Sequence, residues 1–383
     1  MQVYLDNAAT TRLDPRILSK MKPYLSDLYA NPSSIHWAGQ EAYRHLMTAK
    51  KMVAKELGGD PGNVIFTSGA TEANNLIIKG VALANRAKGN KIIISSLEHP
   101  CVRESALELQ AAGFQVKIIP ADSEGLIKPD ALLKLIDKQT ILVSVMAVNN
   151  EIGTIQDITA LARIAHKYGA YFHSDATQAI PYQRLDVKKM GLDFLSLSAH
   201  KIYGPKGVGV AYLNRRIKIK PLIIGGGQED NYRSGTYNLP GIMGLAYALQ
   251  LSYQERSLYL KKVKSLRDYL WQKVKTEIPN VQLNGSLKKR VEANLNIMFS
   301  SIEGEAILMD LSHKGIYVST GSACSASNLK ASQVLQAIGL NKNFLNSNIR
   351  FSLGRFNTKT EIDYTVKCLK ETVSRLRRFS PIS

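Results

Sequence analysis

Residues Phe194-Leu195-Ser196-Leu197-Ser198 run directly into Ala199-His200-Lys201-Ile202-Tyr203-Gly204-Pro205. The first half is a short apolar run of the kind that forms a buried strand. Lys201 follows the end of this strand and is preceded by Ser198 and His200. A lysine that bonds an aldehyde needs a partly desolvated pocket, because desolvation lowers the pKa of its amine. Most lysines are simply exposed, but this setting at a strand end favours a chemical role.

Around this junction, short apolar runs alternate with amphipathic helical segments from about residue 63 onward. Apolar strands separated by helices predict a mostly parallel sheet with both faces covered. Ligands bind such sheets at the carboxyl ends of the strands. The strands expected here are Val64–Thr67, Lys91–Ser95, Gln115–Ile119, Ile141–Val148, Ala170–Ser174 and Phe194–Ser198.

The pattern changes after about residue 253, where basic helical stretches precede three further strands and a last helix. Thr358 and Glu361 form a capping box at the start of that helix. This region predicts a second, smaller α+β domain, although no Pro- or Gly-rich linker marks its boundary. Its expected strands lie near Ala293–Phe299, Ile316–Thr320 and Asn348–Leu353.

Polar residues follow three other predicted strands. Gly69-Ala70-Thr71 opens a helix, and the amides of a helix start can bind an anion, although many such turns are only structural. His99 follows the second strand, and Asp175 and Gln178 begin another helix, where an aspartate is often only a cap. A phosphate cradle, an acid for a ring nitrogen, a flat ring and Lys201 together match what pyridoxal 5'-phosphate (PLP) requires.

The chain has three cysteines, Cys101, Cys324 and Cys368. They form neither a disulfide framework nor a zinc pair, so no metal site is predicted. Cys324 lies among small polar residues from 319 to 328, which predicts a mobile exposed loop suited to carry a nucleophile. For Cys101 and Cys368 we favour packing, and the closeness of Cys101 to His99 leaves a minor role open.

The composition limits which binding partners and which cellular compartment are expected. A length of 383 residues suits one large domain and a smaller one. The net charge of +19 favours acidic partners. The basic runs are dispersed and carry no RNA-binding motif, so direct nucleic-acid binding is disfavoured. No apolar run approaches the roughly 20 residues of a membrane helix. The first residues lack the basic region of a secretory signal, so we expect a cytoplasmic protein with no membrane association.

The chain resembles the cysteine desulfurases of the NifS/IscS type, in the class V aminotransferase group of fold-type I PLP enzymes. The resemblance spans nearly the whole length and implies an α/β fold. A mostly parallel seven-stranded sheet is expected in a large PLP-binding domain of residues 15–257. Residues 1–14 and 258–383 are expected to form a smaller α+β domain that carries the cysteine loop. The matching motifs are Tyr4–Thr11, Asn31–His36, Thr67–Glu72, Val148–Thr154, Asp175–Gln178, Ser198–Lys201, Gly225–Glu229, Arg233–Thr236, Gly321–Cys324 and Arg350–Arg355.

The resemblance also implies roles in PLP binding. Lys201 bonds the cofactor and shuttles a proton, Asp175 pairs with the ring nitrogen, and His99 stacks on the ring. Gln178 and Asn150 approach the phenolic oxygen of the ring. The phosphate is held by one further group of residues, of which Thr236 reaches in from a second subunit and so implies a homodimer. That group is Thr71, Ser198, His200 and Thr236, and Ala70 is a further cofactor-binding residue.

The implied reaction converts L-cysteine to L-alanine. Asn31 and Arg350 hold the substrate carboxylate, and Cys324 takes the sulfur as a persulfide. The catalytic residues are thus Lys201, Cys324 and His99. The persulfide then passes to an acceptor protein, either an iron–sulfur scaffold or an enzyme that thiolates tRNA or another nucleic acid.

Two departures from the family and several alternatives remain open. Pro100-Cys101 follows His99 where the family more often has Lys-Ala, which bears on local packing only. The chain ends soon after its last helix, so we expect it to lack the longer tail with which housekeeping members hold a scaffold. A selenocysteine lyase or an aminotransferase of the same superfamily would share the PLP pocket. A further alternative, a nucleic-acid-binding protein with an inactive enzyme fold, is supported by the net charge alone.

Overall fold

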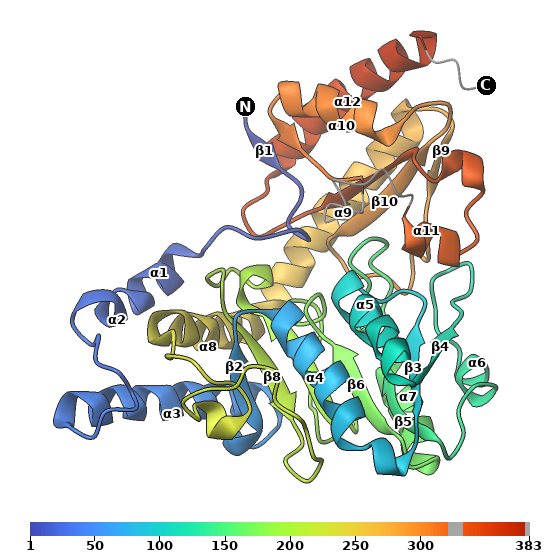
Figure 1. The fold of residues 1–383 in the computed structure, drawn as a ribbon. Coiled ribbons are helices and arrows are strands. Elements are labelled where there is room, and N and C mark those ends of the chain that lie inside the picture. The colour runs from blue at the N-terminus through green and yellow to red at the C-terminus, as the bar shows by residue number, and fades with distance from the viewer. Residues whose placement is uncertain (321–331, 380–383) are drawn as a thin grey trace.

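The computed structural model describes residues 1–320 and 332–379, and its centre is a seven-stranded sheet (Figure 1). Strand β8 runs antiparallel to both of its neighbours, β2 and β7, whereas the other neighbouring pairs are parallel. The expectation of a mostly parallel seven-stranded sheet is confirmed. In spatial order the strands are β2 (Val64–Thr67), β8 (Gly209–Leu213), β7 (Phe194–Ser198), β6 (Tyr171–Asp175), β5 (Thr140–Ser144), β3 (Lys91–Ser95) and β4 (Gln115–Ile119).

The expected strands of this sheet are all present, and four have the predicted bounds. The run from residue 141 ends as a strand at Ser144, although Val145 and Ala147 still donate backbone hydrogen bonds to carbonyls of β6. Strand β8 was not predicted from the sequence, in which glycines and a lysine precede its apolar run.

Helices cover both faces of the sheet, as alternating apolar strand residues require. Ile92 and Ile94 of β3 face the side chains of α4 (Ala70–Ala84) and α5 (Pro100–Glu108). Ile93, between them, belongs to the cluster on the opposite face. That cluster also holds residues of α1 (Pro15–Met21), α2 (Pro23–Ser26), α3 (Trp37–Leu57), α6 (Pro129–Leu133), α7 (Ile158–Lys167) and α8 (Leu239–Gln254).

A second apolar core lies above the large sheet in Figure 1. It packs a three-stranded antiparallel sheet, in the order β12 (Asn348–Ser352), β10 (Asn294–Phe299) and β9 (Val281–Leu283), against three helices. Residues Val3 and Leu5 join this core, because β1 (Val3–Tyr4) pairs in parallel with β11 (Ile316–Tyr317). The three helices are α9 (Arg256–Glu277), α10 (Gly304–His313) and α12 (Lys359–Phe379).

The division of the chain at residues 15 and 257 stays a prediction. Membership of Val3 and Leu5 in the second core supports placing the first residues there. In contrast, Val334 and Leu335 of α11 (Gln333–Ala337) pack in the core of the large sheet. Within the described part of the chain, no helix combines the length and the apolarity that crossing a membrane demands.

Candidate active site

Four of the predicted site residues gather at the carboxyl edge of the large sheet. Asp175 is the last residue of β6, and Lys201 ends a 3-10 turn, Ala199–Lys201, directly after β7. His99 follows β3 and caps α5, and Thr71 lies in the first turn of α4 after β2. Because these strands are parallel, their carboxyl ends bring residues far apart in sequence to one edge.

The N-terminal segment lies against Lys201. Lys201 Nζ donates to the carbonyl oxygens of Ala8 and Ala9 at 2.5 and 2.7 Å. Gln178 Nε2 donates to the same Ala8 oxygen at 2.9 Å. Sequence reasoning did not predict these contacts, because nothing local links residues 8 and 9 to residue 201. The Tyr4–Thr11 motif was the available signal.

Strained backbone follows the lysine. Tyr203 has a φ of 63°, in the left-handed region that costs a side-chain-bearing residue about 1 to 3 kcal/mol. Its backbone N–H donates to Thr11 Oγ1 at 2.8 Å, and its hydroxyl accepts from the Arg355 N–H at 2.6 Å. These two contacts hold the turn after Lys201 in a single conformation.

Asp175 is buried, and both of its carboxylate oxygens are engaged. Oδ1 accepts from the Thr177 N–H at 2.9 Å, and Oδ2 accepts from Asn74 Nδ2 at 2.7 Å. An aspartate held in this way can keep a proton on the nitrogen of a bound pyridine ring.

His99 is held as a neutral imidazole. Its Nδ1 accepts from the Cys101 N–H at 3.2 Å, which leaves the ring hydrogen on Nε2. Burial lowers the pKa of His99, with nearby Lys201 acting in the same direction and Asp175 against it. The Cys101 sulfur lies 3.0 Å from Nδ1, and burial raises the pKa of this thiol to about 12. Cys101 therefore borders the site as a thiol, beyond the packing role favoured from sequence.

The start of α4 is the predicted phosphate site, and glycines on neighbouring elements shape the backbone around it. A side chain at Gly209 would place its Cβ 2.6 Å from Gly69 Cα, so glycine at this position lets the β2–α4 turn approach β8. Ser198 Oγ lies 3.7 Å from where a Cβ on Gly69 would stand. His200 Nδ1 lies 3.1 Å from Thr10 Oγ1, and burial lowers the pKa of His200 to about 4. A neutral imidazole can bind an anion by donating its ring N–H.

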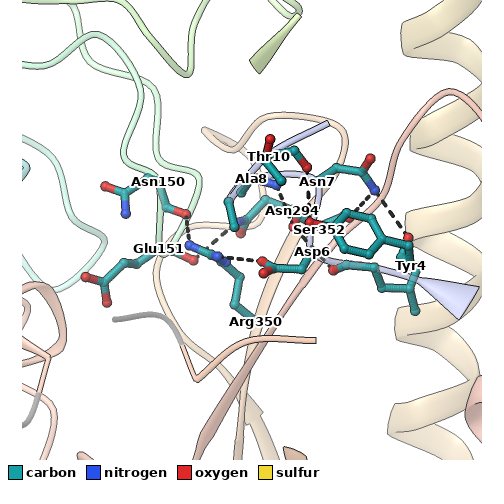
Figure 2. A network of polar contacts seen from close by, with 12 residues as sticks. Tyr4, Asp6, Asn7, Ala8, Thr10, Asn150, Glu151, Asn294, Arg350 and Ser352 are labelled. Atoms are coloured by element: carbon teal, nitrogen blue, oxygen red, sulfur yellow. Dashed lines mark hydrogen bonds and ion pairs between the residues drawn. The ribbon is translucent and has the colours of Figure 1, made fainter. Parts of the chain in front are cut away.

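Arg350 joins the second sheet to this edge (Figure 2). Its side chain is buried, one terminal nitrogen lies 2.7 Å from Asp6 Oδ1, and the other donates to the Asn150 carbonyl at 3.0 Å. The structure thus brings Arg350 and Asn150 together through the backbone of Asn150. A buried guanidinium at this position can bind a carboxylate with two hydrogen bonds.

Two predicted residues are exposed in the single chain. Asn31 precedes α3, and its Oδ1 accepts from the Ser33 N–H at 2.9 Å. Thr236 precedes α8 in the segment that includes Arg233. Arg233 Nε lies 2.8 Å from Glu72 Oε1 in the first turn of α4, an ion pair that holds the segment before Thr236 against α4.

Cys324 lies outside the described residues, but its flanks are fixed. Before it, Ser319 and Arg350 exchange backbone hydrogen bonds of 3.2 and 2.6 Å. After it, Ser332 caps α11 and donates from Oγ to Glu151 Oε2 at 2.5 Å. The chain on either side of Cys324 is therefore anchored next to Arg350 and Glu151.

The residues present fit PLP. The start of α4 offers a phosphate site, Asp175 an acid for the ring nitrogen, His99 a flat neutral ring, and Lys201 an amine for the aldehyde. This combination of strand-end groups defines a PLP enzyme of fold type I.

Comparison with known proteins places the chain more narrowly. Residues 3–365 match the aminotransferase class-V family. The chain is 45% identical over 380 residues to cysteine desulfurase IscS of Dictyoglomus turgidum, covering 99% of this chain and 96% of that protein. It is 44% identical over 383 residues to the human cysteine desulfurase, covering 99% and 83%. A solved NifS-like protein superposes with a TM-score of 0.93 at 40% identity, covering 98% of this chain and 100% of the other.

The chain therefore belongs to the aminotransferase class-V family. Within that family it groups with the NifS/IscS-type cysteine desulfurases, so the family and the enzyme class expected from the motifs are confirmed. The aminotransferase and selenocysteine lyase alternatives are not favoured by these relatives.

Proposed function

We propose that this protein is a PLP-dependent cysteine desulfurase that converts L-cysteine to L-alanine and takes the sulfur onto Cys324. One arrangement carries the proposal: Lys201, Asp175 and His99 meet at one strand edge, and Arg350 approaches the same edge from the second sheet. The full-length relatives are named cysteine desulfurases, which supports the choice of substrate.

When bound, PLP supplies a ring that takes up the electrons left when a proton leaves the α-carbon of an amino acid. Asp175 holds the proton on the ring nitrogen and so strengthens this effect. Lys201 would hold the aldehyde of bound PLP, and its Nζ would accept the α-proton of the substrate. The Ala8 and Ala9 carbonyls can hold the resulting ammonium, as they hold Nζ in this structure.

Arg350 and Asn31 bind the substrate carboxylate and direct the side chain of the substrate toward Cys324. The Cys324 thiolate then attacks the substrate sulfur. The carbon–sulfur bond breaks, a sulfur–sulfur bond forms, and the carbon takes a proton to give alanine. The sum is cysteine plus thiol giving alanine plus persulfide, and it needs no outside oxidant or reductant.

We also propose a homodimer, in which Thr236 of each chain completes the phosphate site of the other. Large apolar side chains are exposed near Asn31 and in the segment before Thr236. Exposed apolar groups of this size often mark a protein interface. They are Tyr29, Ile35, Trp37 and Ile224.

The acceptor is proposed to be a partner protein, either an iron–sulfur scaffold or a thiolating enzyme, and the protein is proposed to act in the cytoplasm. The net charge of +19 supports a partner with an acidic surface. Radiolabelled persulfide on Cys324 should pass to such a partner and remain on the enzyme when a basic control protein is added.

The test is to add L-cysteine to purified protein and to measure alanine and protein-bound persulfide. Wild type should form both. Lys201→Ala should form neither, and Cys324→Ser should bind L-cysteine but carry no persulfide. Cys368→Ala is the matched control, because Cys368 is buried in the second core. Full persulfide formation by Cys324→Ser would contradict the proposal.

A further inference from the structure

Asn74 lies at the centre of a buried polar cluster that the mechanism above does not use. It sits on α4, one turn after the proposed phosphate site, and its side chain is fully buried. Its Nδ2 donates to Asp175 Oδ2 at 2.7 Å and to the Cys101 sulfur at 3.1 Å. Its Oδ1 accepts from Ser196 Oγ at 2.5 Å. The amide thus has partners on both its oxygen and its nitrogen.

The two partners of Asn74 together fix which way its amide points. The Asp175 carboxylate can only accept, so it takes the nitrogen end of Asn74, and Ser196 on β7 donates its hydroxyl to the oxygen end. The cluster continues beyond Ser196. Ser196 Oγ lies 3.4 Å from His173 Nε2, and His173 Nδ1 lies 2.8 Å from Ser144 Oγ. Burial lowers the pKa of His173 to about 4, so this part of the cluster is neutral at pH 7. This part of the cluster orients the Asn74 amide and places no further charge near Asp175.

Through Cys101, the same amide is connected to His99. The Cys101 sulfur that accepts from Asn74 lies 3.0 Å from His99 Nδ1. One side chain therefore contacts the acid that would hold the ring nitrogen and the thiol beside the imidazole that would stack on the ring. Substitution of Asn74 removes the element common to these two contacts.

We propose that Asn74 is a positioning residue that fixes Asp175 and the Cys101–His99 pair relative to each other, and so sets how tightly PLP binds and how firmly its ring nitrogen is protonated. This inference rests on the proposed function. Removing one hydrogen bond to a charged group costs enough free energy to change a dissociation constant about tenfold to hundredfold. That is the size of effect expected.

The decisive variant is Asn74→Asp. It preserves the shape of the side chain and an oxygen toward Ser196, but it replaces the donor to Asp175 with a second carboxylate oxygen. The PLP dissociation constant, measured by reconstituting the enzyme with PLP, should rise about tenfold or more. The pH midpoint of the visible absorbance band should shift, and kcat should fall more than KM for L-cysteine changes. The titratable groups that face Asp175 in wild type are Glu98, His99, Cys101 and His173, and Asn74→Asp adds one carboxyl to them.

Asn284→Asp is the matched control, because it makes the same chemical change at another buried amide. Asn284 Nδ2 donates to Asn296 and Asn348 in the second sheet, at 2.8 and 2.6 Å. This variant should lower the melting temperature but leave the PLP dissociation constant and the band unchanged. If Asn74→Asp does not fold, Ser196→Ala decides, since it leaves Asn74 in place and removes the hydroxyl that donates to its oxygen.

The outcomes separate the two proposals. A wild-type enzyme without a cofactor band would overturn the proposed function and this inference with it. A wild-type band together with unaltered PLP affinity and pH midpoint in the deciding variant would overturn this inference alone. Weaker PLP binding and a shifted midpoint, with the control unchanged, would support it.

Discussion

Several titratable side chains near Asp175 are buried, and burial favours their neutral forms. It raises the pKa of Glu98 to about 8 and that of Cys101 to about 12, and it lowers that of His173 to about 4. At neutral pH these three groups are therefore mostly uncharged. These three groups therefore add no charge next to the Asp175 side chain.

Glu98 should make the stability of the protein depend on pH. Burial raises its pKa from 4.5 to about 8, so between these values the folded state binds more protons than the unfolded state. Stability should then fall by a few kcal/mol, as an order of magnitude, as pH rises from about 5 to about 8. Glu98→Gln should flatten this fall, because the amide oxygen can still accept from the Ser95 hydroxyl and the Met146 N–H. Denaturant unfolding at several pH values measures the free energy of unfolding of both proteins. An equal dependence on pH in wild type and Glu98→Gln would contradict the prediction.

Asp6 should act on substrate binding through Arg350. The ion pair of 2.7 Å fixes one terminal nitrogen of a buried guanidinium (Figure 2). Asp6→Asn removes the charge but retains the shape, and KM for L-cysteine should rise about tenfold with a smaller change in kcat. Steady-state kinetics measure both quantities. A lower KM would mean that Asp6 competes with the substrate carboxylate instead of orienting Arg350.

Among the elements, α12 begins with the capping box expected from Thr358 and Glu361. The Thr358 N–H donates to Glu361 Oε2 at 2.8 Å, and the Glu361 N–H donates to Thr358 Oγ1 at 3.3 Å. Thr358→Ala should lower the free energy of unfolding by about 1 kcal/mol, because the helix packs in the second core. Urea denaturation checks this value. Glu371→Ala, at an exposed site on the same helix, should have a smaller effect, and an equal loss in both would argue against the cap.

Six of the seven strands of the large sheet were predictable because each is a short run rich in apolar residues, as in β3 and β7. Asp175 and Lys201 were also predictable, since each lies at or just after the end of such a strand. Asn74 and the Ala8 and Ala9 carbonyls were not, because their importance comes from contacts with residues distant in sequence. Periodicity identifies a strand or a helix, but it does not show which buried amide faces which carboxylate.

In the molecule as a whole, the N-terminal segment connects the two cores. Val3 and Leu5 pack in the second core, and the Ala8 and Ala9 carbonyls then contact Lys201 at the edge of the large sheet. Asp14 follows and receives hydrogen bonds from Arg16, which lower its pKa to about 2, together with a bond from Arg355 at 2.5 Å. Because this short stretch of chain contacts both cores, a displacement of the second core would also displace the carbonyls that contact Lys201.

The homodimer can be tested by complementation between inactive chains. The Lys201→Ala chain lacks the lysine but retains Thr236. The Thr236→Ala chain lacks the threonine but retains Lys201. If Thr236 of one chain completes the phosphate site of the other, a mixed dimer contains one site with both residues intact. Unfolding and refolding the two variants together should therefore recover alanine formation that neither shows at the same level when refolded separately.

The control pairs Lys201→Ala with Asp175→Ala. Both residues lie at the same sheet edge of a single chain, so every site in that mixed dimer lacks one of them, and no activity should return. Recovery only in the pair containing Thr236→Ala would place Thr236 in the partner's site. No recovery in either pair, with mixed dimers verified by affinity tags on the two chains, would instead place Thr236 at the phosphate site of its own chain, beside Arg233 and the start of α4.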